Sequence, residues 1–120
     1  MRWTVLPAHV ADVMEQGAAV AQRAGLGAAL AAHAGVGVVE AVLARAGSAD
    51  AAAVVAVLEE WRTLVRAAGG QAVIESAPLA VKVMVPVWDD PGPSLRIMQK
   101  IKSRLDPNGL LNPGRFVGGI

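Results

Sequence analysis

The fold is decided by GSADAAAVVAVLEEWRTLVRAAGGQAVIES, residues 47–76. Its first part has the apolar spacing of an amphipathic helix. One face of that helix carries Val54, Leu58, Trp61 and Val65. Ser48 or Asp50 is suited to cap the first amides, and Gly69 is suited to end the helix. QAVIES follows at once and predicts a strand, so the stretch supplies a helix that is directly followed by a strand.

Three further elements are predicted upstream of this helix. Two apolar runs, residues 28–34 and 36–44, are separated by a break between glycines and predict a β-hairpin. A helical period begins at Pro7 and ends near Gly25, and RWTVLP before it predicts a first strand. The predicted order is therefore β, α, β, β, α, β.

This order predicts an α+β fold, a ferredoxin-like βαββαβ sandwich in which two helices cover an antiparallel sheet. We assign residues 1–77 to this core. Residues 78–120 are expected to add a Pro-rich extended segment, a third helix and a tail, packed on the same single domain. Valines alternate with other residues over 81–88, which predicts extended chain, and Pro86 favours an edge position. The third helix is expected from Ser94 to about Leu105. Its inward residues are expected to be Met98, Ile101 and Leu105.

Composition excludes several functional classes. The formal net charge of +1 offers no field for attracting nucleic acid, and the absence of cysteine excludes disulfides, thiolate metal sites and thiol catalysis. The most apolar run, residues 24–47, contains His33, Glu40 and several glycines, which argues against a membrane span. No signal peptide pattern is visible at Met1. We expect a cytoplasmic protein.

Two groups of residues could carry chemistry before the tail is considered. His33 and Glu40 lie on opposite strands of the predicted hairpin and could be metal ligands or simply hydrogen-bonded and solvated residues. Without a third ligand, no metal site is assigned. The second group is basic and is either a solvated helix face or a docking surface for a phosphate-bearing cofactor or an acidic partner. It comprises Arg96, Lys100, Lys102, Arg104 and Arg115.

The tail LDPNGLLNPGRFVGGI, residues 105–120, has the composition of a shaped loop. Asn108-Gly109 and Asn112-Pro113-Gly114 each predict a turn, which would hold the backbone before Arg115 in one path. A guanidinium keeps its charge and donates in a fixed fork, so Arg115 is suited to a carboxylate or a flavin carbonyl. A purely structural tail is the alternative.

The stretch MQKIKSRLDPNGLLNPGRF, residues 98–116, resembles the carboxyl-terminal signature of FAD-linked oxidases of the vanillyl-alcohol oxidase superfamily. In that signature a helix is followed by Lys-x-x-x-Asp-Pro-x-Gly-x-Leu-Asn-Pro-Gly-Arg/Lys. Within the superfamily, the chain from about Ala67 onward is most similar to the small flavoprotein (E) subunits of glycolate oxidase. The matching residues are Lys102, Asp106, Pro107, Gly109, Leu111, Asn112, Pro113, Gly114 and Arg115.

The resemblance implies a parent protein with an amino-terminal FAD-binding domain, a cap domain and a final segment that returns to the flavin. It implies that Asn112, Gly114 and Arg115 contribute to cofactor binding, and that FAD belongs to the full-length parent and does not bind tightly to this chain alone. The implied partners are that FAD-binding domain and other glycolate oxidase subunits, with no nucleic acid and no membrane span. Peripheral membrane association through the parent complex is the alternative to a purely cytoplasmic location.

The hairpin departs from the family pattern His-x-Gly-Asp-Gly-Asn-x-His. His33 matches the first histidine, whereas Val36, Val38 and Glu40 replace the Asp, the Asn and the second histidine. Residues 75–77 are Glu-Ser-Ala where the family has Glu-His-Gly. These changes argue against a divalent metal and against a histidine base, so His33 is only a weak candidate for the catalytic base.

The favoured hypothesis is a carboxyl-terminal fragment of a glycolate-oxidase-like, FAD-dependent 2-hydroxyacid oxidoreductase subunit, inactive by itself. It would contribute to the flavin and substrate environment and to subunit contacts. A different class remains as the alternative, namely a stand-alone ferredoxin-like protein-interaction module without catalysis. A third possibility is a relative of D-lactate dehydrogenase with a working metal site, which metal analysis with His33→Ala as control would decide.

Overall fold

The computed structural model describes residues 1–44 and 50–120. These residues form two compact units, Met1–Val87 and Trp88–Ile120. The regular elements of the first unit are β1 (Arg2–Thr4), α1 (Val10–Arg23), β2 (Gly27–His33), β3 (Val38–Ala44), α2 (Ala51–Ala67), β4 (Gln71–Val73) and α3 (Leu79–Lys82). The second unit contains α4 (Leu95–Leu105) and the tail. Short 3₁₀ turns occur at Pro7–His9, Ala34–Val36, Gly92–Ser94 and Val117–Gly119.

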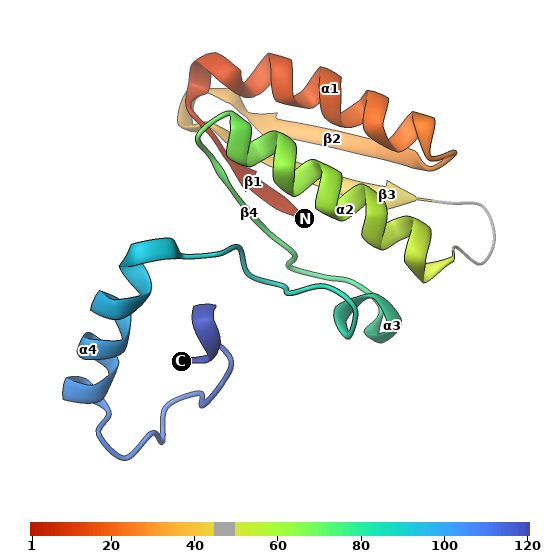
Figure 1. Ribbon diagram of the computed structural model, residues 1–120. Helices are drawn as coiled ribbons and strands as arrows, with labels where there is room; N and C mark the ends of the chain where they lie inside the picture. Colours follow the sequence, from red (N-terminus) through yellow and green to blue (C-terminus); the bar gives the residue numbers. More distant parts are fainter. Residues whose placement is uncertain (45–49) are drawn as a thin grey trace. The chain divides into compact units, whose positions relative to one another are not determined.

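The first unit confirms the predicted α+β, ferredoxin-like arrangement. Its four strands form one antiparallel sheet in the order β2-β3-β1-β4, and α1 and α2 lie on one face of it (Figure 1). The hairpin register pairs Gly27 with Ala44 and His33 with Val38, so the predicted break between glycines is where the chain turns. Asp50 caps α2 by accepting a hydrogen bond from the Ala52 amide at 3.1 Å, whereas Ser48 lies outside the described residues.

The core between the helices and the sheet is built on two tryptophans. Trp3 of β1 and Trp61 of α2 are both fully buried, with their rings edge to face and their centroids 5.1 Å apart. The Trp61 indole N–H donates to the carbonyl oxygen of Gly17 in α1 at 2.8 Å. These two side chains therefore tie both helices to the central strand, in a core that is otherwise mostly Val, Leu and Ala.

Gly17 lets α1 approach this tryptophan pair, and replacing it with Ala is expected to destabilise the protein. A Cβ at Gly17 would lie 2.5 Å from Cη2 of the buried Trp3 ring, which has no room to move. The clash should outweigh the better helix propensity of Ala and lower the free energy of unfolding by about 1–3 kcal/mol. Chemical denaturation measures this change. The exposed Ala18→Gly variant is the control, because it alters propensity alone and should cost about 0.5–1 kcal/mol.

The segment after β4 differs from its prediction. Residues 81–88 alternate in sequence and predict extended chain, but α3 forms at Leu79–Lys82 and turns continue to Met84. Val81 and Val85 are buried whereas Val83 and Met84 are exposed, so burial follows a spacing of four residues. The expectation of extended chain is wrong here because both buried valines pack against the core from one face of a helical turn.

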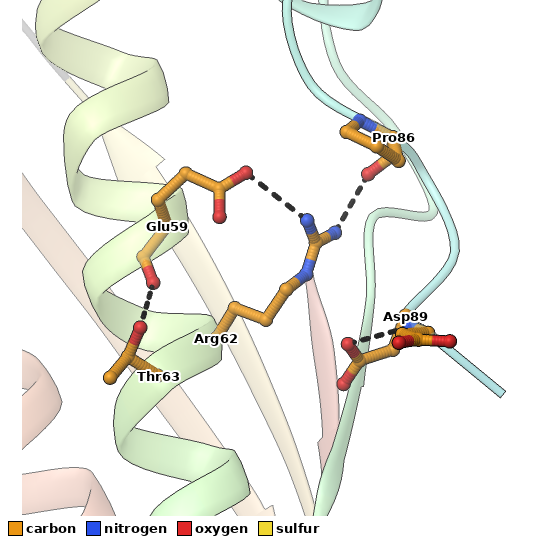
Figure 2. Close-up of polar contacts among 6 residues, drawn as sticks. Glu59, Arg62, Thr63, Pro86 and Asp89 are labelled. Atoms are coloured by element: carbon orange, nitrogen blue, oxygen red, sulfur yellow. Dashed lines mark hydrogen bonds and ion pairs between the residues drawn. The ribbon is translucent and has the colours of Figure 1, made fainter. Parts of the chain in front are cut away.

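A buried arginine fixes the chain that follows α3. Arg62 of α2 is almost fully buried, and its Nη2 donates to the carbonyl oxygen of Pro86 at 2.7 Å. Its Nη1 donates to Glu59 Oε1 at 3.2 Å, as Figure 2 shows. The amide of Ile74, just after β4, donates to the carbonyl oxygen of Val87 at 2.8 Å. The first unit therefore extends ten residues beyond the predicted boundary at residue 77. The expected packing of both parts in a single domain stays a prediction.

The second unit has one helix, α4, which begins at Leu95 after Ser94, although the Ser94 side chain makes no capping hydrogen bond. The helix ends where predicted, at Leu105. None of its residues is buried, and Ile101 and Leu105 are 53% and 78% exposed, so the expectation that they point into a core is wrong. The unit is too small to enclose them, and they line a groove instead.

Candidate functional site

The candidate site is the tail of the second unit, and Asp106 anchors it. This residue follows the last turn of α4, and its carboxylate accepts hydrogen bonds from the Leu110 and Leu111 amides, both at 2.9 Å. Its side chain is only 6% exposed. The chain between these residues turns through Pro107 and Gly109, and Gly109 adopts φ +62°. One carboxylate therefore closes the loop that follows the helix.

Lys102 completes this anchor from the preceding turn of α4. Its Nζ lies 2.5 Å from Asp106 Oδ2 and donates to the carbonyl oxygen of Leu111 at 2.5 Å. The hydrogen bond from Lys102, followed by those from the Leu111 and Leu110 amides, lowers the pKa of Asp106 to about 2. The carboxylate is thus held ionised at neutral pH, and its charge is compensated locally.

The segment from Asn112 to Arg115 forms the next turn. The Arg115 amide donates to the carbonyl oxygen of Asn112 at 3.2 Å. Pro113 and Gly114 occupy the central positions, and Gly114 has φ +70°, as the second central residue of a type II turn requires. Asn112 itself has φ +47°, a left-handed conformation that Asn tolerates better than most residues. The predicted turn at Asn112-Pro113-Gly114 is confirmed. The positive φ angles explain why Asn and Gly suit positions 112 and 114.

The carbonyl group of Arg115 is also held. Trp88 donates its indole N–H to the Arg115 carbonyl oxygen at 3.2 Å. The Trp88 ring packs edge to face on Phe116, with centroids 5.2 Å apart. The backbone of Arg115 is therefore fixed through both its amide and its carbonyl, so its side chain leaves from a defined position.

These elements enclose an open groove of about 720 Å³ within the second unit. Its lining is mainly apolar. The residues are Met98, Ile101, Lys102, Leu105, Asp106, Leu111, Asn112, Arg115, Phe116 and Ile120. Lys102 and Asp106 neutralise one another, and within the described residues no ion pair involves Arg115. The groove thus combines an apolar surface with a single uncompensated cation, which suits a planar or apolar group that carries a negative or carbonyl oxygen.

The predicted site residues divide between the two units. Asn112 and Arg115 line the same groove, with Gly114 in the turn that joins them. His33 belongs to the first unit, where it ends β2, is exposed and pairs with Val38. Glu40 pairs with Ala31, two residues from His33 along β2. Among residues 1–44 and 50–120 there is no group of three potential ligands that could hold a metal ion.

Sequence reasoning missed the roles of Lys102, Asp106 and Trp88. From sequence, Lys102 is one of the basic residues, and Lys102 and Asp106 match the oxidase signature, without an anchoring role for either. The spacing of four residues between a Lys and an Asp, immediately before Pro107 and a glycine turn, is a usable signal for such an anchor. The Trp88–Arg115 hydrogen bond joins residues 27 positions apart, so no local pattern could have indicated it.

The anchor predicts a dependence on acidic pH. The pKa of Asp106 is lowered from 3.8 to about 2, so the folded tail favours the carboxylate more than the unfolded chain does. This stabilisation is complete above about pH 4 and is lost as the pH falls through the folded-state value near 2. NMR-detected exchange at the Leu110 and Leu111 amides should show protection that declines over this range. Asp106→Asn should abolish the transition, and a transition that persists in that variant would contradict the assignment.

One comparison with known proteins matches the segment that contains this site. Residues 88–116 match the family model described as FAD linked oxidases, C-terminal domain. The match covers about a quarter of the chain and spans Trp88, α4, the Asp106 anchor and Arg115. Neither the curated proteins nor the solved structures gave a match. The second unit therefore contains a segment similar to the C-terminal domain of FAD-linked oxidases. Within the described ranges, no helix has the length and apolar character needed to cross a membrane.

Proposed function

We propose that the chain is the C-terminal, cap-type part of an FAD-dependent 2-hydroxyacid oxidoreductase of the glycolate oxidase type. The observation that carries the proposal is the coincidence of the matched segment, residues 88–116, with the anchored turn that fixes Arg115. The flavin would be held mainly by an N-terminal FAD-binding domain of the same parent. Other subunits of a glycolate-oxidase-like complex would be further partners, in the cytoplasm or at the membrane surface.

The groove fits one end of a flavin better than a whole FAD. Phe116 and Met98 offer apolar surface to a ring system, and Arg115 and Asn112 offer donors for carbonyl oxygens. The adenine and pyrophosphate would depend on the other domain, because the sequence contains no phosphate-cradling glycine loop. When bound, FAD supplies the acceptor for the hydride removed from the hydroxyacid.

Arg115 has the clearest role under this proposal. Its guanidinium would donate to the substrate carboxylate or to a flavin carbonyl, and the fixed backbone would limit the conformational entropy lost on binding. Asn112 would be the neighbouring hydrogen-bond donor. A group must also remove the hydroxyl proton, and His33 stays the candidate in this chain for that base.

The test is purification of the full-length parent with its associated proteins, followed by measurement of bound flavin and of 2-hydroxyacid oxidation. Arg115→Met is expected to lower kcat/KM or flavin occupancy by about tenfold or more. Lys82→Met is the matched control, because Lys82 is an exposed cation of the first unit and should have no such effect. A parent complex purified without flavin would sink the proposal.

The second candidate function is an interaction module without catalysis. It is favoured by the sheet, because both long helices cover one of its faces (Figure 1). Burial alternates along β3, and Val42 is 58% exposed on the uncovered face. Such a face can pack on another protein. A flavin-free native product that purifies with partners, and whose association is lost in Val42→Glu, would favour this function over the oxidoreductase.

A further inference from the structure

Helix α4 presents two exposed stripes side by side. Ile97, Ile101 and Leu105 repeat every four residues and are 63%, 53% and 78% exposed. Arg96, Lys100 and Arg104 repeat with the same spacing, one position earlier, and are also exposed. Residues four apart on a helix lie on the same face, so an apolar ridge runs directly beside a basic one.

The apolar stripe continues into a hollow surface. Ile101 and Leu105 line the groove of about 720 Å³ together with Leu111, Phe116 and Ile120 from the tail. Leu111 is 65% exposed and Phe116 is 52% exposed. Such a contiguous apolar surface is typical of a site that another structure covers, and its concave shape suits the side chains of a helix.

The charge next to this surface is one-sided. Residues 88–120 contain five basic and three acidic side chains, and α4 itself contains no acid. The acid nearest in sequence, Asp106, is already paired with Lys102. Within the described residues no ion pair involves Arg96, Lys100 or Arg104. Three cations of this helix are therefore available to carboxylates on a partner.

We propose that α4 and the groove form a docking site for an acidic amphipathic helix of a partner protein. Apolar side chains of that helix would enter the groove beside Ile101 and Phe116, and carboxylates along one flank would face Arg96, Lys100 and Arg104. A lipid surface fits less well. A helix lying on a membrane has cationic residues on both sides of its apolar face, whereas the free cations of α4 lie along one side of the apolar stripe. A flat bilayer surface also cannot fill a groove. The inference does not depend on flavin binding, and because the flavin is proposed for the same groove, the helix and the flavin would exclude one another there.

The test uses the full chain and a designed helical peptide of about 18 residues, enough for five turns. The peptide carries Leu at helical spacing and Glu along one flank, and the matched peptide has Lys in place of Glu. Fluorescence anisotropy at low salt gives the affinities, and NMR shifts identify the residues affected. The acidic peptide is expected to bind at least about tenfold more tightly, with shifts in α4 and residues 110–120.

Variants make the proposal falsifiable. Arg96→Glu, Lys100→Glu and Arg104→Glu together should reverse the preference in favour of the Lys peptide, while Lys82→Glu in the first unit should leave it unchanged. Ile101→Ser should weaken binding of both peptides, and its exposed position keeps the fold intact. The proposal would be overturned if the two peptides bound equally well, or if the NMR shifts were confined to the first unit. Protection of α4 by anionic vesicles but not by peptide would also overturn it. So would self-association through α4 that the acidic peptide cannot displace.

Discussion

Replacing Trp61 with Ala is expected to lower the free energy of unfolding by about 3–5 kcal/mol, the range typical of removing a buried large aromatic side chain. The indole is fully buried, contacts Trp3 edge to face and donates to the Gly17 carbonyl oxygen at 2.8 Å. Its removal leaves a cavity between both helices and the sheet, and that carbonyl loses its side-chain donor. Denaturant titration followed by circular dichroism measures the change.

A pair of milder variants separates the ring from its hydrogen bond. Trp61→Phe removes the N–H that binds Gly17, whereas Trp3→Phe removes an indole N–H that has no hydrogen-bond partner among the described residues. Both changes shrink a buried indole to a phenyl ring. Trp61→Phe should therefore cost about 1 kcal/mol more than Trp3→Phe. Equal losses would mean that packing alone, and not the bond to α1, determines the contribution of Trp61.

Replacing Asp106 with Ala is expected to release the tail while leaving the first unit intact. The change removes the acceptor of the Leu110 and Leu111 amides and the partner of Lys102 in one step. Protection of both amides against exchange should fall by about tenfold or more, because hydrogen bonds to a charged acceptor are stronger than neutral ones. Amide exchange and ¹⁵N relaxation, read at residues 106–120 and separately in the sheet, measure the effect.

Two further variants test the anchor. Lys102→Met keeps the Asp106 carboxylate and its backbone partners, so it should produce a smaller loss of protection than Asp106→Ala. Asp90→Ala is the matched control, because Asp90 also accepts one backbone hydrogen bond, from Gly92, but outside the tail. If Asp90→Ala loosened residues 110–115 as much as Asp106→Ala does, the carboxylate of Asp106 would not be the anchor.

The fold of the first unit could be predicted because local signals agreed with one another. Asp50 caps α2, Gly25 and Gly69 adopt the left-handed conformation after α1 and α2, and the break at Gly37 turns the hairpin. Each signal is local, and the order of elements then leaves few ways to close a sheet. The observed strand order β2-β3-β1-β4 is one of the few that this limit allows.

The errors arose where burial depends on residues far apart in sequence. Val81, Val83 and Val85 alternate in sequence, but packing against the core selected Val81 and Val85 and left Val83 outside. The sequence of α4 has a clear amphipathic pattern, but this pattern does not indicate whether another part of the protein packs against the apolar face of the helix. Ile101 and Leu105 are consequently exposed in a helix whose bounds were predicted well.

The candidate site was predictable in its residues but not in its support. Asn112, Gly114 and Arg115 stand out through turn chemistry and through the resemblance to FAD-linked oxidases. Asp106 and Lys102 hold Leu110 and Leu111, just before these residues, through short-range contacts. Trp88 holds the Arg115 carbonyl oxygen from 27 positions away, which no local pattern indicates. His33 stood out through its place in a family motif, and its location on β2 leaves its role a prediction.

The anchor at Asp106 also has a kinetic consequence. It joins residues four and five positions apart, and Lys102 reaches Leu111 across nine, so its contacts can form as soon as α4 does. Loops of this size close in about 10–100 ns, far sooner than a sheet that must bring β1 and β4 together from opposite ends of the first unit. The loop closed by Asp106 is therefore expected to form early, and a transplanted segment 88–116, which includes Trp88, should keep the shape of the turn that carries Arg115.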